Sequence, residues 1–166
     1  MRYPPVTQGV PLVAVAHGSR DPRAAATVAE LLALVRRRGR PGPPVVTSYL
    51  DHAPPTPIQA LGAIETGPVV VLPLLLTAAY HSKIDIPGML GEAQARYPRL
   101  RLRTAGTLGP HPLLLTALER RLAEAGVRIG DPDTAVVLVS AGSSDPAANA
   151  VVAGMAAAWR ARGWWD

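Results

Sequence analysis

Short, uniformly apolar runs alternate along the chain with longer stretches in which apolar residues recur every three or four positions. A short apolar run bounded by turn residues is typical of a buried strand, and the second pattern is typical of an amphipathic helix. The pattern predicts strands at 10–16, 44–50, 68–76, 100–106 and 134–141, and helices at 22–39, 57–65, 86–97, 111–126 and 146–163.

The alternation of strands and helices predicts the fold class. Strands that are apolar throughout are typical of a parallel sheet covered by helices on both faces, and the crossovers between such strands are right-handed. We therefore expect an open, doubly wound α/β domain. Asp21 and Asp85 each precede a predicted helix with a proline in its first turn, so both are predicted N-caps.

An internal repeat links the two ends of the chain. Residues 16–39 align without gaps on residues 140–163, and both segments contain the pattern Gly-Ser-x-Asp-Pro. The second copy extends over only one strand and one helix. We expect a first domain over 1–130 that carries the site, followed by the start of a duplicated second domain over 131–166, or by an extra βα unit packed on the first domain.

Composition narrows the function classes. Apolar residues make up 48% of the chain, which argues against a disordered protein, and the absence of cysteine excludes disulfides and thiolate metal sites. The longest apolar run, 68–80, is too short to span a bilayer, so a cytoplasmic protein without a membrane partner is expected. The net charge of +5 suits an anionic partner, although an arginine-rich solvated surface would give the same balance.

The four histidines, His17, His52, His81 and His111, follow the first four predicted strands in turn. The carboxyl ends of parallel strands share one edge of the sheet, where open α/β folds bind their ligands. The first and third strands are neighbours in common doubly wound orders, so His17 and His81 are predicted to face one another across a crevice. Taken alone, His17 could equally be a helix-entry histidine that is satisfied by the backbone.

Two imidazoles without thiolates suit a borderline divalent ion such as iron, cobalt or nickel, and a neutral imidazole is a good base near pH 7. Asp51 follows the second strand and could add a carboxylate ligand or could be a turn residue. Arg20, Arg23 and Lys83 belong to the same edge, where helix N-termini also attract anions, and could hold carboxylates of a substrate.

Other chemistries fit less well. Neither of the glycine-rich phosphate-binding motifs occurs, so no nucleotide is expected. Ser19 lies in His-Gly-Ser-Arg-Asp rather than in a nucleophile elbow, and it is predicted to cap the next helix. The chain has no phenylalanine and few other aromatic residues, so no nucleic-acid partner is expected.

The segments VAVAHGSRDPRA, SYLDHAPPTP, LPLLLTAAYHSKIDIP and LGPHPLL resemble those of the sirohydrochlorin chelatases of the CbiX/SirB type, over residues 10–126 and again over 134–163. The resemblance implies a chelatase-like α/β fold and insertion of Co²⁺ or Fe²⁺ into the tetrapyrrole sirohydrochlorin without ATP, for cobalamin or sirohaem. It leaves the choice between cobalt and iron open. Members of the family include short chains that dimerise and longer chains with two similar halves, so a homodimer is one option.

The resemblance also implies roles for individual residues. His17 and His81 match the two catalytic histidines, which would hold the metal and take the two pyrrole protons. Asp51 falls where many members have a glutamate, and its shorter side chain would be the third metal ligand. The remaining expectations are that Ser19, Arg20 and Lys83 contact substrate carboxylates and that Ala141, in place of a histidine, leaves the second copy without a site.

Two other functions stay open at this point. The incomplete second repeat would also fit a non-catalytic module that carries a tetrapyrrole or a metal. A flavodoxin-like nucleotide binder is a weaker alternative, because the expected fold would be similar but the phosphate-binding motifs are absent.

Overall fold

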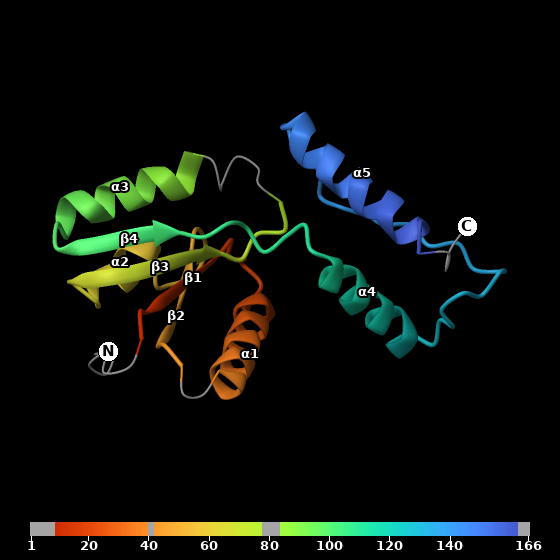
Figure 1. Ribbon diagram of the computed structural model, residues 1–166, viewed down its shortest axis with the longest axis horizontal. Coiled ribbons are helices and arrows are strands. Elements are labelled where there is room, and N and C mark those ends of the chain that lie inside the picture. The colour runs from red at the N-terminus through yellow and green to blue at the C-terminus, as the bar shows by residue number, and fades with distance from the viewer. Residues whose placement is uncertain (1–8, 40–41, 78–83, 163–166) are drawn as a thin grey trace. The chain divides into compact units, whose positions relative to one another are not determined.

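The computed structural model describes residues 9–39, 42–77 and 84–162 (Figure 1). These residues form two compact units, which are described separately. The first unit contains the described residues up to Leu75 together with those from Ile84 to Thr107. The second contains Leu76, Thr77 and the residues from Leu108 onward.

The first unit is a parallel α/β structure. Its elements, in chain order, are β1 (Leu12–Ala16), α1 (Pro22–Arg38), β2 (Val45–Tyr49), α2 (Pro57–Gly62), β3 (Gly67–Pro73), α3 (Ile86–Arg96) and β4 (Leu100–Thr104). The strand order is β2-β1-β3-β4, and every pair is parallel. The predicted fold class and the first four predicted strands are confirmed.

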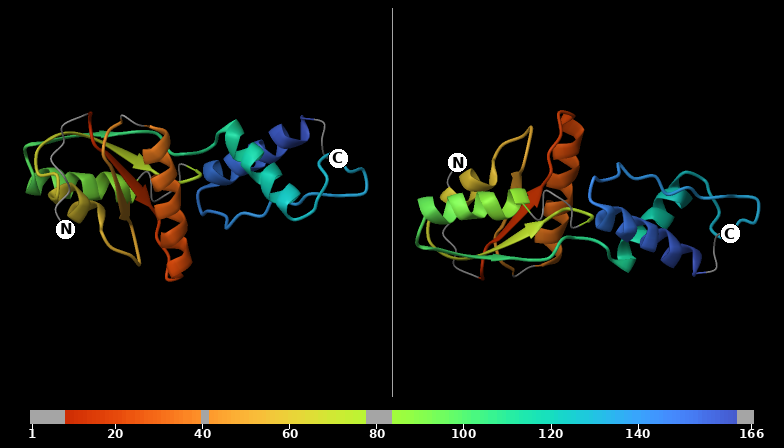
Figure 2. Two further views of the ribbon diagram at one scale, coloured as in Figure 1. Left: turned by 90° about the horizontal axis from the view of Figure 1, so that it is seen from below. Right: turned by 90° about the horizontal axis from the view of Figure 1, so that it is seen from above.

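Helices cover both faces of this sheet, with α1 on the opposite side of the strands from α3 (Figures 1 and 2). The larger core lies between the sheet and the helices α2 and α3, where Val13, Val15 and Leu61 are each 0% exposed. A smaller core, formed by Ala14, Leu32 and Val45, lies against α1. Successive residues of β1 therefore contribute to opposite cores, as the pleat of a strand requires.

The helix starts follow from local sequence. The carboxylate of Asp21 accepts a hydrogen bond from the Arg23 backbone N–H at 2.9 Å, so the predicted cap of α1 is confirmed. Thr56 and Gln59 form a reciprocal capping box at the start of α2. The prediction for Asp85 is wrong: it stands at the N-cap position of α3, but its backbone is already helical and its side chain makes no capping hydrogen bond.

The second unit consists of α4 (Pro112–Glu124), α5 (Pro146–Arg160) and the segment between them. Leu115 and Trp159 are the buried centre of its core. The indole N–H of Trp159 donates to the Glu119 carboxylate at 2.9 Å, and the Arg162 guanidinium lies 3.0 Å from the same oxygen. Among the described residues, none of the helices has the length and apolar character needed to cross a membrane.

The strand predicted at 134–141 is not formed: the described residues of this segment pair with no other strand. Val137 and Val139 are 81% and 84% exposed, whereas the aligned residues of β1, Val13 and Val15, are fully buried. The physical reason is that an extended segment becomes a strand only beside a neighbour. β1 has such a neighbour on each edge, and the described part of the second unit supplies none.

The turn encoded by Gly-Ser-x-Asp-Pro nevertheless has the same local structure in both copies of the repeat. Gly18 and Gly142 both have positive φ, of 94° and 76°. Each is followed by a serine whose hydroxyl accepts a backbone N–H two residues later, at 3.0 Å for Ser19 and 3.1 Å for Ser143. The repeated motif therefore specifies one local structure in two different surroundings. The predicted domains 1–130 and 131–166 were defined by the sequence repeat, whereas the two units are defined by their compactness. The predicted division into domains therefore stays a prediction.

Candidate functional site

His17 and Asp51 meet at the carboxyl edge of the first unit's sheet. His17 directly follows β1, and Asp51 comes two residues after β2. The Asp51 backbone N–H donates to the His17 carbonyl oxygen at 2.9 Å, and Leu50 donates to Ala16 in the same way. The parallel ladder thus continues past the ends of both strands and fixes the backbones of these two predicted site residues beside each other.

Gly18 makes this close approach possible. A Cβ added to Gly18 would lie 1.8 Å from the Asp51 carbonyl oxygen, and the φ of Gly18 is +94°. Both observations require glycine, because a side chain would collide with the backbone and L-residues rarely adopt this conformation. The glycine that follows His17 therefore allows the loops after β1 and β2 to come into contact.

The chain leaves β3 at the same edge. The Leu74 N–H donates to the Val15 carbonyl oxygen at 2.8 Å, so the end of β3 lies against the end of β1. His81 and Lys83 lie in residues 78–83, which are outside the described residues. The neighbouring strands fit the predicted approach of His81 to His17, which itself stays a prediction.

A cavity of about 480 Å³ lies beside Asp51. Its other lining residues come from the loop after β2 and from the start of α3, which together contribute Leu50, Ile84, Asp85, Gly88, Met89 and Glu92. The volume is in the range of small-ligand sites. Three of the seven described lining residues are carboxylates and none of these seven is a cation, so the described wall of the cavity attracts a positively charged ligand. Sequence reasoning missed Glu92, because no local pattern separates it from an ordinary surface residue of a helix.

His17 is exposed, and its Nδ1 lies 3.2 Å from the Gly18 carbonyl oxygen. A protonated Nδ1 would donate to this oxygen, and the basic nitrogen would then be Nε2. A fixed tautomer of this kind is what metal-ligating and proton-accepting histidines need. The local geometry is therefore compatible with both of the roles predicted for His17.

The residues after His17 have mainly local partners. The Ser19 hydroxyl accepts the Asp21 N–H at 3.0 Å, which confirms its predicted contribution to the turn. The Arg23 guanidinium holds the Asp21 carboxylate with two nitrogens, at 2.9 Å and 2.6 Å from Oδ2. This pairing lowers the pKa of Asp21 and raises the pKa of Arg23. Arg23 is thus engaged with the helix cap, whereas Arg20 is exposed.

The two remaining described histidines, His52 and His111, have different local surroundings. His52 follows β2 in the first unit, with a positive φ of 63°. His111 belongs to the second unit, where its Nδ1 accepts the Leu113 N–H and caps α4. The expectation that all four histidines share one edge therefore stays a prediction for His111, which belongs to the other unit.

The described residues contain no group of three His, Cys, Asp or Glu side chains placed to hold a metal ion. A full ligand set would therefore need residues from the 78–83 segment or donor atoms from a bound molecule. His17 and Asp51 supply two of the three predicted ligands, and the third is His81. The assignment of all three as metal ligands stays a prediction.

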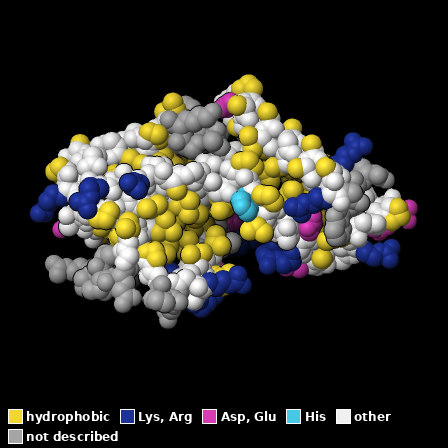
Figure 3. All heavy atoms as spheres, in the orientation of Figure 1, with side chains coloured by type: hydrophobic (Ala, Val, Ile, Leu, Met, Phe, Trp, Pro, Cys, Tyr) yellow, Lys and Arg dark blue, Asp and Glu magenta, His cyan; other side chains and the backbone are white. Residues whose placement is uncertain are grey.

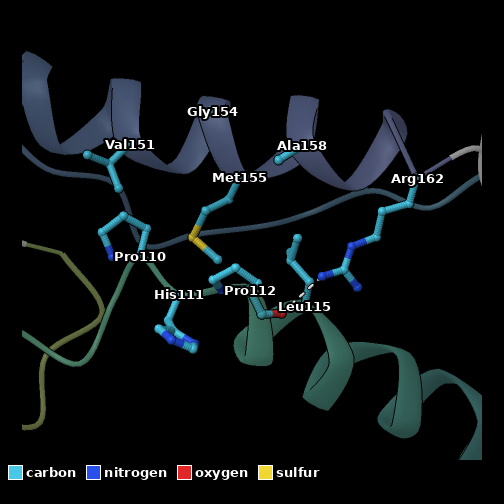
Figure 4. Close-up of a pocket in the computed structure, with 9 residues that line it drawn as sticks. All are labelled: Pro110, His111, Pro112, Leu115, Val151, Gly154, Met155, Ala158 and Arg162. Carbon is cyan, nitrogen blue, oxygen red and sulfur yellow. Dashed lines mark hydrogen bonds between the residues drawn. The ribbon is translucent and has the colours of Figure 1, made fainter.

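The second unit has a cavity of its own, of about 550 Å³. Figure 4 shows it between α5 and the start of α4, with Met155 reaching from α5 toward Pro112 and with the His111 ring turned away. The walls are mainly apolar, and the Arg162 guanidinium at one end is bound by Glu119 and by the Pro112 carbonyl oxygen. The cavity is therefore part of an apolar packing surface rather than a second polar site.

The protein has a parallel sheet of order β2-β1-β3-β4, and polar side chains lie at its carboxyl edge. These features define an open α/β domain of the kind that binds ligands at that edge. The sequence profile of the family described as CbiX matches residues 11–125. The chain belongs to the CbiX family.

Curated relatives and solved structures agree with this assignment. The chain is 35% identical over 140 residues to a sirohydrochlorin cobaltochelatase from Priestia megaterium, which covers 81% of this chain and 45% of the relative. It is 36% identical over 102 residues to a sirohydrochlorin ferrochelatase from the same organism, covering 60% and 38%. The chain thus spans about half the length, or less, of the curated relatives it matches.

Two solved structures show the same fold. SirB from Bacillus subtilis with Fe³⁺ matches with a TM-score of 0.79 and 29% identity, over 92% of this chain and 61% of that one. SirB from Bacillus subtilis subspecies spizizenii in complex with cobalt matches with a TM-score of 0.78 and 28% identity, over 92% and 62%. These related proteins were thus solved with iron and in complex with cobalt.

Proposed function

We propose that this chain carries the metal-inserting site of a sirohydrochlorin chelatase, which places Co²⁺ or Fe²⁺ in sirohydrochlorin without ATP. The observation that carries the proposal is the junction of His17 and Asp51, joined by a 2.9 Å backbone hydrogen bond beside an acidic cavity. Membership of the CbiX family and the names of the relatives support metal insertion as the role of this junction.

The reaction exchanges protons for a metal ion. Two N–H protons leave the macrocycle as the divalent ion enters, so the site must present the ion and accept the protons. His17 and His81 would do both, with Asp51 as a third oxygen ligand. The carboxylates beside Asp51 would raise the local concentration of the incoming cation. The protein thereby supplies position and proton acceptance, and the macrocycle supplies the final ligands.

Sirohydrochlorin is a polycarboxylate, and Ser19, Arg20 and Lys83 are proposed to contact its acidic side chains. Arg20 is the exposed cation next to the turn after β1. Ser19 can still donate its hydroxyl hydrogen, since its oxygen accepts the Asp21 N–H. Arg23 is left out of this set because its guanidinium already pairs with Asp21.

The test is an anaerobic assay of the purified chain with sirohydrochlorin and either Co²⁺ or Fe²⁺, followed by the visible spectrum. We expect faster insertion than in the protein-free control, and loss of that acceleration in His17→Ala and in His81→Ala. His111→Asn is the matched control, because asparagine preserves the cap of α4 in the second unit. Equal rates with and without the wild-type chain would contradict the proposal.

The second candidate is a non-catalytic module that binds the tetrapyrrole or the metal. It fits the observation that the described residues contain no group of three side chains placed to hold a metal ion. Tight binding of sirohydrochlorin in a titration, with no acceleration of insertion, would support this candidate over catalysis. A homodimer, which would supply a second copy of every unit, stays a prediction.

A further inference from the structure

Gly109, in the loop after β4, lies directly against the backbone of the chain that leaves β3. A Cβ added to Gly109 would lie 2.3 Å from the Leu76 carbonyl oxygen and 3.1 Å from the Leu76 carbonyl carbon. Side-chain carbons do not approach a carbonyl oxygen so closely, so this contact requires glycine. Both residues belong to the second unit, and Gly109 is buried.

The contact depends on backbone atoms rather than on side chains. The Leu76 side chain is 59% exposed, so its burial contributes little to holding this point of the chain. The loop at 105–110 contains no charged residue, and Figure 3 shows mainly apolar and uncharged atoms over it. A Cβ at Gly109 would also lie 3.1 Å from Leu114 Cδ1, in the first turn of α4. The added atom would therefore be confined between α4 and the Leu76 carbonyl group, and it would displace that group.

Leu76 stands in the chain between a fixed strand end and a predicted metal ligand. Two residues before it, the Leu74 N–H donates to the Val15 carbonyl oxygen at 2.8 Å. Five residues after it in the sequence is His81, which is outside the described residues. Because the ladder to β1 restrains the chain before Leu76, a shift of Leu76 passes mainly to the residues that follow it.

We propose that Gly109 is a positioning residue for His81. By admitting the Leu76 carbonyl group, it sets the starting point of the segment that carries His81 to the metal. The inference rests on the proposed function, in which His81 holds the ion with His17 and Asp51. Groups that orient a metal ligand without touching the metal change the metal affinity by roughly tenfold to a hundredfold when they are altered.

A purely structural role for Gly109 leads to a different result. In that case Gly109→Ala would destabilise the second unit, and metal affinity would change no more than in any other variant that destabilises this unit. A positioning role requires instead that the effect on metal affinity disappears once His81 is removed, because Gly109 then has no ligand to place.

The experiment is a titration of the whole chain with Co²⁺ alone, followed by the visible absorption of the bound ion. We expect Gly109→Ala to weaken binding roughly tenfold and to change the absorption bands, as His81→Ala should also do. Added to His81→Ala, Gly109→Ala should cause no further loss, so the double-mutant cycle should be strongly non-additive. Because no tetrapyrrole is present, this result does not depend on whether the chain accelerates insertion.

Two other glycines provide matched controls. Gly106 is exposed in the same loop, and a Cβ added there would meet no described atom within 4 Å, so Gly106→Ala should leave the Co²⁺ affinity unchanged. Gly142→Ala strains the second unit through a positive φ of 76°, and its added Cβ likewise meets no described atom within 4 Å. It should destabilise this unit and leave the Co²⁺ affinity unchanged. Tryptophan fluorescence during urea unfolding checks that each variant is folded.

Wild-type affinity in Gly109→Ala, beside weakened binding in His81→Ala, would overturn the positioning role and leave the proposed function intact. Additive losses in the double variant would also overturn it, as would loss of the folded second unit in Gly109→Ala, since Gly109 would then act on the fold alone. Unchanged affinity in His81→Ala would overturn both proposals. Non-additive losses in a chain that does not accelerate insertion would refute the proposed function and support the positioning role.

Discussion

The two glycines of the repeated turn predict different consequences for the same substitution. Gly18 and Gly142 both have positive φ, at +94° and +76°. Alanine at either position costs roughly 1–2 kcal/mol for the backbone conformation alone. A Cβ at Gly18 would also lie 1.8 Å from the Asp51 carbonyl oxygen, whereas a Cβ at Gly142 has no atom within 4 Å in the described structure.

The collision at Gly18 forces the loops after β1 and β2 apart. This movement breaks the hydrogen bond from the Asp51 N–H to the His17 carbonyl oxygen, which contributes about 1 kcal/mol. Gly18→Ala should therefore lower the free energy of unfolding of the first unit by roughly 2–3 kcal/mol, against roughly 1–2 kcal/mol for Gly142→Ala in the second. Gly18→Ala should also slow metal insertion, because His17 and Asp51 are no longer held together.

Hydrogen exchange of the β1 amides measures the stability of the first unit. Tryptophan fluorescence during urea unfolding reports the C-terminal part, since all three tryptophans, Trp159, Trp164 and Trp165, lie there. The expected result is faster β1 exchange in Gly18→Ala and unchanged β1 exchange in Gly142→Ala. If the two variants behave alike in both measurements, the contact with Asp51 is not what restricts Gly18.

Three further predictions concern stability. Val15→Ala should cost about 1–2.5 kcal/mol in urea unfolding because Val15 is fully buried, and Val139→Ala should cost almost nothing because Val139 is 84% exposed; similar costs would show that the 134–140 segment is paired in solution. Glu119→Gln should destabilise the second unit by about 1–3 kcal/mol, since it weakens two hydrogen bonds to one carboxylate oxygen. An unchanged urea midpoint, measured by tryptophan fluorescence, would contradict this prediction. The pairing with Arg23 lowers the pKa of Asp21 in the folded state, so its contribution to stability is present above the unfolded pKa and is lost as pH falls through the folded pKa. Asp21→Asn should therefore reduce the acid-side dependence of the unfolding midpoint, and an unaltered pH profile would refute this role.

Much of the first unit could be predicted from the sequence. Apolar runs such as 10–16 identify strands because a strand between two covered faces has no polar side. Asp21 and Thr56 act within one turn of their own position, and such local capping needs no tertiary information. Asp85 shows the limit of the same reasoning, because a residue with helical backbone at the N-cap cannot direct its side chain to the first free N–H groups.

The candidate site was predicted in part. His17 and Asp51 could be assigned to one edge because the carboxyl ends of parallel strands coincide there. The contact between their backbones and the participation of Glu92 in the cavity wall could not be foreseen, because they depend on how two loops and a helix are placed. The assignment of His111 to the second unit was not evident from the sequence, since its position along the chain follows the same pattern as that of the other histidines.

The sequence by itself determined which segments are helices, where α1 and α5 begin, and that the Gly-Ser-x-Asp-Pro turn occurs twice, because hydrogen bonds within a few residues decide these features. Only the tertiary structure decided that residues 12–16 form a strand while the aligned residues 136–140 do not. Both segments have the same apolar pattern. A strand, however, is completed by hydrogen bonds to its neighbours, and those neighbours are distant in sequence and are present only for β1 in the described structure.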